Sequence, residues 1–290
     1  MTDQANGLNR TDTLRAIHRA MEEDLYYGPD ITSIATVAES ARAVAEVRTR
    51  QEGVVSGLEI IAWTLETQIP TEKFSVALLV DDGARVVPGD IVARIEAPTR
   101  ALLTCERTFL NLIGHMSGIS TAVSRWVREL EGTPTRVRDS RKTLPGMREM
   151  QKYAVRAGGG INHRMGLGDE ALIKDNHVIA AGSVVEAYLD VRRMYPSKFC
   201  EVEVDSLEQF EALLPYKPDM ILLDNFSVDD VATAVSKRND QAPEMQLEAS
   251  GGLTLSDARA YGNTGVDFVA VGALTHSVDV LDLGLDFLEQ

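Results

Sequence analysis

The second half of the chain repeats one pattern, in which a short β-branched or apolar run is followed by a segment of helical periodicity. The strand-like runs are RVRDS (136–140), ALIKD (171–175), FCEVEVD (199–205), DMILLDN (219–225), MQLEASGG (245–252) and DFVAVGAL (267–274). Helical segments such as SLEQFEALL (206–214) and SVDDVATAV (227–235) separate them, and Ser227 is placed to cap the second. Alternating strands and helices predict a parallel sheet, and we expect an α/β fold built on an incomplete parallel α/β barrel of six to seven strands.

Nearly every predicted strand ends in a chemically useful group. These groups are Arg141 and Lys142, Lys174, Glu203 and Asp205, Asp224, Ser250, and Gly272. One charge after one strand is commonly a helix cap, but the carboxyl ends of parallel barrel strands meet on one face, where active sites form. A whole ring of such groups therefore predicts a functional site on that face.

The first hundred residues have a different pattern. A helix with Leu14, Ile17, Met21 and Leu25 on one face precedes the strand-like runs RAVAEVRTR (42–50), GVVSGL (53–58), FSVALLV (74–80) and DDGARVVPGDIVARIEAP (81–98). This order predicts an N-terminal α+β open-sandwich domain. Its last run is similar to a biotinyl-carrier hairpin, but the turn lacks the lysine that would carry the cofactor.

We predict two domains. The N-terminal α+β domain covers residues 1–115, with 278–290 packing back on it, and the barrel covers 116–277. The helical segment TCERTFLNLIGHMSGISTAVSRWVREL (104–130) is expected to bridge them.

Composition excludes several classes of protein. A formal net charge of −15 argues against nucleic acid as a partner, because phosphate backbones are bound mainly by Lys and Arg. The start MTDQANGLNRTD lacks the features of a signal peptide, and no later segment has the apolar length of a membrane span, so we expect a cytoplasmic protein. Cys105 and Cys200 have no metal-like spacing and are expected to be buried, reduced thiols.

Positive charge is nevertheless concentrated between residues 136 and 164. The basic residues there are Arg136, Arg138, Arg141, Lys142, Arg148, Lys152, Arg156 and Arg164, against Asp139 and Glu149. The four-residue spacing of Arg148, Lys152 and Arg156 also fits a solvated helix face. That explanation has less force for the basic residues outside the helical run, which instead suggest an anion site.

The segment GGGINHR (158–164) places three glycines just before a histidine and an arginine, side chains well suited to orienting an anion. The glycines predict a tight turn that aims His163 and Arg164 into the barrel mouth. For Gly158 and Gly159, a plain helix C-cap is the alternative.

The stretch RDSRKTLPGMREMQKYAVRAGGGINHRMGLGDEALIKDNH (138–177) resembles the nicotinate-nucleotide pyrophosphorylases (carboxylating), that is, the quinolinate phosphoribosyltransferase family. Further matches follow in the same order and extend the resemblance from about residue 20 to the end: ERTFLNLIGHMSGIS (106–120), EVEVDSLEQ (201–209), ILLDNFS (221–227), LEASGGLTL (247–255) and VGALTHSVDVLDLGLDF (271–287). Ser140 stands where the family more often has threonine, and the hydroxyl is retained.

The resemblance implies transfer of phosphoribosyl from phosphoribosyl pyrophosphate to the ring nitrogen of quinolinate with decarboxylation, in de novo NAD biosynthesis. It implies a quinolinate pocket made of Arg107, Arg141, His163, Arg164 and Lys174. It also implies a phosphate site on the backbone of Ser250, Gly251 and Gly272, with His276 nearby.

The resemblance further implies catalytic roles for Lys142, Lys174, Glu203 and Asp224, with Mg²⁺ on the two carboxylates. The alternative for those carboxylates is a salt bridge to Lys142 or Lys174 inside the barrel. The family is also expected to form a homodimer, or a higher assembly of dimers, in which Arg107 completes its neighbour's pocket.

Two other functions remain open from the sequence. One is a paralogue of the same fold that uses nicotinate or serves molybdenum transport, although the number of cations favours a dicarboxylate. The other is a non-catalytic barrel that senses phosphorylated metabolites, against which the retention of Glu203 and Asp224 argues.

Overall fold

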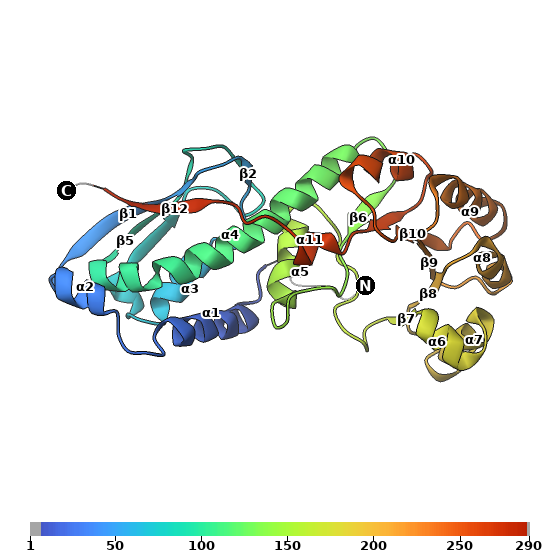
Figure 1. Ribbon diagram of the computed structural model, residues 1–290, viewed down its shortest axis with the longest axis horizontal. Helices are drawn as coiled ribbons and strands as arrows, with labels where there is room; N and C mark the ends of the chain where they lie inside the picture. Colours follow the sequence, from blue (N-terminus) through green and yellow to red (C-terminus); the bar gives the residue numbers. More distant parts are fainter. Residues whose placement is uncertain (1–6, 289–290) are drawn as a thin grey trace. The chain divides into compact units, whose positions relative to one another are not determined.

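Helices and strands alternate from residue 136 onward as the sequence predicts (Figure 1). The computed structural model describes residues 7–288, so the terminal parts of the predicted segments 1–115 and 278–290 lie outside the described residues. Two compact units divide the chain. Unit 1 comprises the described residues of Met1–Ser124, Thr143–Gly159 and Thr275–Gln290, and unit 2 comprises Arg125–Lys142 and Gly160–Leu274.

Unit 2 is built on a parallel sheet, which within the described residues has six strands. In spatial order they are β6 (Arg136–Arg138), β11 (Phe268–Ala270), β10 (Gln246–Ser250), β9 (Met220–Asp224), β8 (Cys200–Val204) and β7 (Ala171–Ile173). All six predicted strands are confirmed. Because β6 and β7 are the edges of this sheet and do not pair with each other in the described residues, the barrel is incomplete, as expected.

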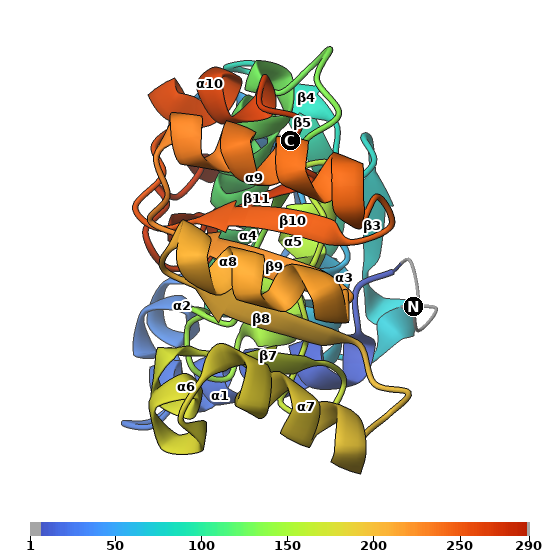
Figure 2. The same cartoon turned by 90° about the vertical axis from the view of Figure 1, so that its right-hand side faces the viewer.

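Helices follow the strands of unit 2, and α8 and α9 lie over the same face of β8, β9 and β10 (Figure 2). The helices of this unit are α6 (Asp175–Ala181), α7 (Val184–Met194), α8 (Leu207–Leu213), η2 (Leu214–Tyr216), α9 (Val228–Gln241), η3 (Leu255–Asp257) and α10 (Ala258–Gly262). The predicted N-cap is confirmed, since the Ser227 hydroxyl accepts from the Asp230 N–H at 3.2 Å. Apolar strand residues such as Val202, Leu223 and Leu247 have no exposed surface and form the core.

Unit 1 contains an antiparallel sheet in the order β12–β1–β5–β3. Its strands are β1 (Arg42–Thr49), β3 (Ser75–Leu78), β5 (Ile91–Pro98) and β12 (Leu283–Phe287), and a separate pair joins β2 (Gly53–Val54) to β4 (Arg85–Val86). The pairing of Ala45 with Phe287 sets β12, from the last part of the described chain, beside β1 (Figure 1). Turns occur at Gly83 and Gly89, where φ is +90° and +96°.

The remaining helices include the long segment predicted around residues 104–130. They are α1 (Arg10–Asp24), α2 (Ile31–Thr36), α3 (Ile60–Glu66), η1 (Thr71–Lys73), α4 (Thr99–Glu129), α5 (Arg148–Ala157) and α11 (Ala273–His276). In α1, Ile17 and Met21 are buried on the predicted face. Among the described residues, no helix combines the length and apolar character that a bilayer crossing requires.

Helix α5 corrects one interpretation of the cationic segment. Its helical spacing is right, but a fully solvated face is wrong, because Lys152 has no exposed surface while Arg148 and Arg156 are half-buried. The residues next to Lys152 are buried as well, so the helix is enclosed over a wide arc.

The first two glycines of the segment 158–164 terminate α5. Gly158 caps the helix, and a Cβ on it would lie 2.6 Å from the Ser120 carbonyl oxygen, which leaves space for glycine alone. Gly159 has a φ of +91°, which favours glycine. The helix-cap interpretation of these two residues is therefore confirmed.

Both cysteines are free and buried, as predicted. Burial raises the pKa of the Cys105 thiol to about 12 and that of the Cys200 thiol to about 11, which keeps both groups protonated and unreactive at neutral pH.

Candidate active site

A cavity of about 400 Å³ lies at the carboxyl ends of the parallel strands. Its volume is within the range of pockets for small ligands. All of the residues that line it belong to unit 2: Ser140, Arg141, Lys142, His163, Arg164, Leu172, Lys174, Glu203, Leu222, Asp224, Glu248, Ser250, Ala270 and Gly272.

The alternation of side chains between the two faces of each strand explains which residues line the cavity. Residues two apart in a strand point to the same face, and the cavity is lined by pairs such as Leu222 with Asp224 and Glu248 with Ser250. Parallel register sets Ser250 opposite Asp224 across β10 and β9. The first member of each pair therefore forms the floor, and the second lies at the strand end, where ligands enter.

The loop that carries His163 is held by a buried aspartate. The Asp139 carboxylate accepts the backbone N–H of His163 at 2.8 Å and the side-chain amide of Asn162 at 2.6 Å. Ile161 adds a backbone hydrogen bond to Val137 of β6 at 2.9 Å. These contacts fix the backbone on which His163 and Arg164 stand.

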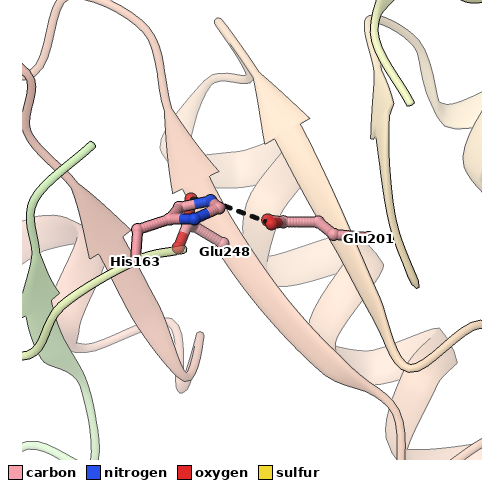
Figure 3. A group of neighbouring side chains, drawn as sticks. All are labelled: His163, Glu201 and Glu248. Atoms are coloured by element: carbon pink, nitrogen blue, oxygen red, sulfur yellow. Dashed lines mark ion pairs between the residues drawn. The ribbon is translucent and has the colours of Figure 1, made fainter. Parts of the chain in front are cut away.

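The His163 ring is buried and makes a contact at each nitrogen. Its Nδ1 accepts the backbone N–H of Arg164 at 2.7 Å, and its Nε2 lies 2.9 Å from Glu201 Oε2 and 3.8 Å from Glu248 Oε1 (Figure 3). The two glutamates extend from β8 and β10 beneath the cavity, and Arg138 Nη1 lies 2.8 Å from Glu248 Oε2.

Two guanidinium groups converge on the cavity. Burial, and then the neighbouring Arg141 charge, lower the pKa of Arg164, so the two cations repel each other. Arg164 Nη1 donates to the Glu170 carbonyl oxygen at 3.1 Å. The Arg141 Nε is buried without a hydrogen-bond partner in the described part of the chain. Paired cations with an unused donor favour an anionic ligand, above all a carboxylate.

Two carboxylates lie on the neighbouring strand ends. Burial, and then the Glu203 charge, raise the pKa of Asp224, so these carboxylates repel each other. Lys174 Nζ forms an ion pair with Glu203, which is one of the internal salt bridges considered from the sequence. Asp224 makes no ion pair within residues 7–288. A pair of adjacent oxygen ligands that lacks full compensation fits a hard divalent cation such as Mg²⁺.

The residues predicted to bind phosphate lie at the carboxyl ends of β10 and β11. Ser250 and Gly272 line the cavity. Gly251 follows Ser250 with a φ of +102°, and a Cβ on it would lie 2.3 Å from Asn225 Oδ1. Glycine is therefore required at this turn whether or not its amide binds a ligand.

Two predicted site residues belong to unit 1. Arg107 is exposed on α4, with its guanidinium 3.9 Å from the Glu106 carboxylate. His276 is exposed at the end of α11, where its ring hydrogen-bonds Ser277 at 2.6 Å. The lining described above comes from unit 2, so the roles of these two residues stay predictions.

The sequence interpretation missed the floor of the cavity. Glu248 lines it directly, and Glu201 lies behind His163. The signal was present, because each glutamate stands two residues before a predicted strand-end group, Ser250 or Glu203, and so shares its face. A charged residue inside an otherwise apolar strand marks an inward-facing polar position.

Glu248 makes the stability of the fold depend on pH. Burial, and then the neighbouring Glu201 charge, raise its pKa from 4.5 to about 7. Between these values the folded protein keeps a proton that the unfolded chain releases, so the free energy of unfolding falls as pH rises. Glu248→Gln removes this titration, and the variant should gain about 1–3 kcal/mol relative to the parent protein between about pH 5 and about pH 8.

Urea unfolding across that pH range measures the change. Glu46→Gln is the matched control, because Glu46 is buried but hydrogen bonds from Arg94 lower its pKa. Glu46 is ionised in both states above about pH 5, so its variant should differ from the parent by a constant amount. An equally constant difference for Glu248→Gln would contradict the prediction.

Two family models match this chain. Residues 30–117 match the family model described as quinolinate phosphoribosyl transferase, N-terminal domain, and residues 119–286 match the corresponding C-terminal domain. The nicotinate-nucleotide pyrophosphorylase [carboxylating] of Mycobacterium leprae is 52% identical over 95% of this chain and 96% of its own. A probable enzyme of that name from Bacillus subtilis is 36% identical over 96% of this chain and 94% of its own.

The fold agrees with these relatives. The structure of the nicotinate-nucleotide pyrophosphorylase from Francisella tularensis superposes with a TM-score of 0.92 and 35% identity, covering 99% of this chain and 100% of that one. Both domains and nearly the full length are matched, so the chain belongs to the quinolinate phosphoribosyltransferase family.

Proposed function

We propose that the cavity binds quinolinate and phosphoribosyl pyrophosphate and catalyses the family reaction, which yields nicotinate mononucleotide, pyrophosphate and CO₂ for NAD biosynthesis. The observation that carries this proposal is the convergence of the cations Arg141 and Arg164 with the carboxylates Glu203 and Asp224 in one cavity. One end suits a dicarboxylate, and the other suits a ribose and a metal-bound pyrophosphate.

The cationic end would hold quinolinate. A planar carboxylate fits the guanidinium fork, and Arg141 and Arg164 offer two such forks, with His163 and Lys174 beside them. Each charge-assisted contact is worth roughly 1.5–3 kcal/mol. The mutual repulsion of the two arginines, visible in the lowered pKa of Arg164, is relieved when a dianion enters.

The chain's own work in the transfer is positioning and charge stabilisation. The pyridine nitrogen is already a nucleophile, so the site needs no strong base to activate it. Lys142 and Arg141 would neutralise the departing pyrophosphate, and Glu203 and Asp224 would orient the ribose and hold Mg²⁺. Bound Mg²⁺ supplies positive charge to the pyrophosphate. After transfer, the cationic ring nitrogen stabilises the carbanion left by decarboxylation, while the arginines retain the remaining carboxylate.

The phosphate end would use backbone amides. Ser250, Gly251 and Gly272 lie where β10 and β11 end, which is the usual phosphate position of α/β barrels. Amide N–H groups bind a phosphate without adding charge. Placing the ribose phosphate there would direct the anomeric carbon toward the carboxylates.

We also propose that two chains share each site. Unit 1 exposes Tyr26, Tyr27 and Ile31, whose exposed fractions are 78%, 96% and 75%. Large apolar groups exposed together are typical of an interface. An exposed Arg107 on the same unit is then available to a partner's pocket.

The free, buried thiols of Cys105 and Cys200 support a cytoplasmic location.

A direct assay separates this proposal from its rivals. Incubation with quinolinate, phosphoribosyl pyrophosphate and Mg²⁺ should release CO₂ and pyrophosphate in equal amounts. Pyrophosphate release with nicotinate but not with quinolinate would identify a monocarboxylate enzyme instead. Binding of both substrates without turnover would support the sensor.

Removing either arginine of the dicarboxylate end should reduce activity severely. Arg164→Ala or Arg141→Ala leaves a substrate carboxylate unpaired and should lower kcat/KM for quinolinate by roughly two to four decades, or about 3–5 kcal/mol. Steady-state kinetics measure the effect. Arg136→Ala is the control, because Arg136 is an exposed arginine of β6 outside the cavity. Near-normal quinolinate kinetics in either test variant would remove that arginine from the site.

Asp224 should govern the metal requirement. Asp224→Asn keeps the size but removes the charge, so the Mg²⁺ concentration for half-maximal rate should rise about tenfold or more. Calorimetric binding of quinolinate without metal should change little. Asp205→Asn, which alters an exposed carboxylate just after β8, is the control. An unchanged Mg²⁺ requirement together with lost quinolinate binding would refute the assignment.

If two chains share each site, two inactive variants should restore activity when their chains are mixed. Arg107→Ala and Arg164→Ala chains are dissociated, mixed and reassociated. A mixed dimer then carries both lesions in one site and leaves the other whole. Half of the dimers are mixed, so recovered activity should approach ~25% of the parent enzyme when sites are independent. Activity no higher than that of the separate variants, with mixed dimers shown by mass spectrometry, would contradict a shared site.

A further inference from the structure

Four charged or ionisable residues are buried together at the floor of the cavity. Arg138, Glu201, Glu248 and His163 come from three strands and one loop, and none is more than 6% exposed. Arg138 Nη1 lies 2.8 Å from Glu248 Oε2. His163 Nε2 lies 3.8 Å from Glu248 Oε1 and 2.9 Å from Glu201 Oε2 (Figure 3). The cluster contains one arginine for two carboxylates.

Fold stability does not explain this cluster. Buried ion pairs are often less stabilising than apolar residues of similar size, because their desolvation is expensive. Here the desolvation is poorly compensated, since one oxygen of Glu201, one oxygen of Glu248 and the Arg138 Nε lack hydrogen-bond partners among the described residues. The adjacent positions Val202, Leu247 and Ala249 show that these strands otherwise carry apolar residues.

The two contacts of the imidazole determine its tautomer. Nδ1 lies 2.7 Å from the backbone nitrogen of Arg164, which is a donor, so Nδ1 must be the unprotonated acceptor. Nε2 must then carry the hydrogen of the ring, and it points to the Glu201 carboxylate at 2.9 Å. The Glu201 carboxylate accepts at Nε2 and the Arg164 amide donates to Nδ1. Together these partners specify one tautomer and one orientation of the ring.

The same geometry argues against a metal at this cluster. Single ligand atoms of His163, Glu201 and Glu248 lie within 4.8 Å of one another, which is compatible with a bound cation. A neutral imidazole binds a metal through an unprotonated nitrogen, and here that nitrogen is Nδ1, which is already engaged by the Arg164 amide. The Arg138 guanidinium also supplies positive charge inside the cluster.

We propose that Glu201, Glu248 and Arg138 are positioning residues for the proposed quinolinate site. Glu201 holds His163 as the Nε2–H tautomer, and the paired Glu248 and Arg138 hold Glu201 and the imidazole in place from below. His163 Nδ1 in turn fixes the Arg164 amide, and with it the guanidinium at the cavity wall. Glu201, Glu248 and Arg138 thus act on the site through His163 and Arg164.

Wild-type protein tests the arrangement without any assay of activity, and so without reliance on the proposed function. Long-range ¹H–¹⁵N spectra of ¹⁵N-histidine protein distinguish the two neutral tautomers, and His163→Asn identifies the signal that belongs to His163. The expected signal is that of an Nε2–H ring with an unprotonated Nδ1. An Nδ1–H ring, or a stoichiometric bound metal found by elemental analysis, would overturn the proposal even if the enzyme turns over quinolinate.

Kinetics of two Glu201 variants test the consequence, which rests on the proposed function. Glu201→Gln keeps an oxygen that accepts the Nε2–H and should stay within about threefold of the parent KM for quinolinate. Glu201→Leu removes the acceptor and should raise that KM about 10- to 100-fold, with the KM for phosphoribosyl pyrophosphate unchanged. Equal effects of the two variants, or equal rises in both KM values, would contradict positioning through His163.

The matched control is Glu46, another buried carboxylate, held by Arg94 at 2.6 Å in the antiparallel sheet of unit 1. Glu46→Gln and Glu46→Leu make the same chemical changes and should lower Tm without altering either KM. A rise in quinolinate KM for Glu46→Leu that matches Glu201→Leu would show a general loss of structure and would overturn the proposal. Absence of quinolinate turnover in the parent protein would refute the proposed function, and the spectra would still test the cluster.

Discussion

Parallel pairing of six strands is the constraint on which the site depends. In a parallel sheet every carboxyl end lies on the same edge, so residues more than a hundred positions apart meet in one cavity. Ser140 and Gly272 line the same 400 Å³ space for this reason. Alternation of side chains along each strand then gives the cavity both a floor and a rim.

Charges of both signs line that cavity. Arg141 and Arg164 stand among the carboxylates Glu203 and Asp224, and like-charged neighbours perturb each other, as the raised pKa of Asp224 and the lowered pKa of Arg164 indicate. Such repulsion is held in place by the fold and is relieved when ions of opposite charge bind. The site is therefore arranged for its ligands before they arrive.

The outcome for the glycine-rich segment shows how far local sequence reasoning reaches. Gly158 and Gly159 end a helix, as their position after α5 predicts, because C-caps depend on nearby backbone alone. The orientation of His163 depends on Asp139, Glu201 and Glu248, which are distant in the chain. The helical spacing also could not predict the burial of Lys152, because spacing shows which residues share a helix face but not which neighbours enclose that face.

By itself, the sequence determined the six strands of the parallel sheet, their alternation with helices, the polar residues at the strand ends and the family, because all of these follow from local periodicity and from motifs in order. Tertiary structure alone decided which residues became partners. It joined β12 to β1, paired Lys174 with Glu203, and buried Arg138 against Glu248 under His163. Those contacts arise from strand register and the desolvation of charge between distant segments, and no local pattern encodes them.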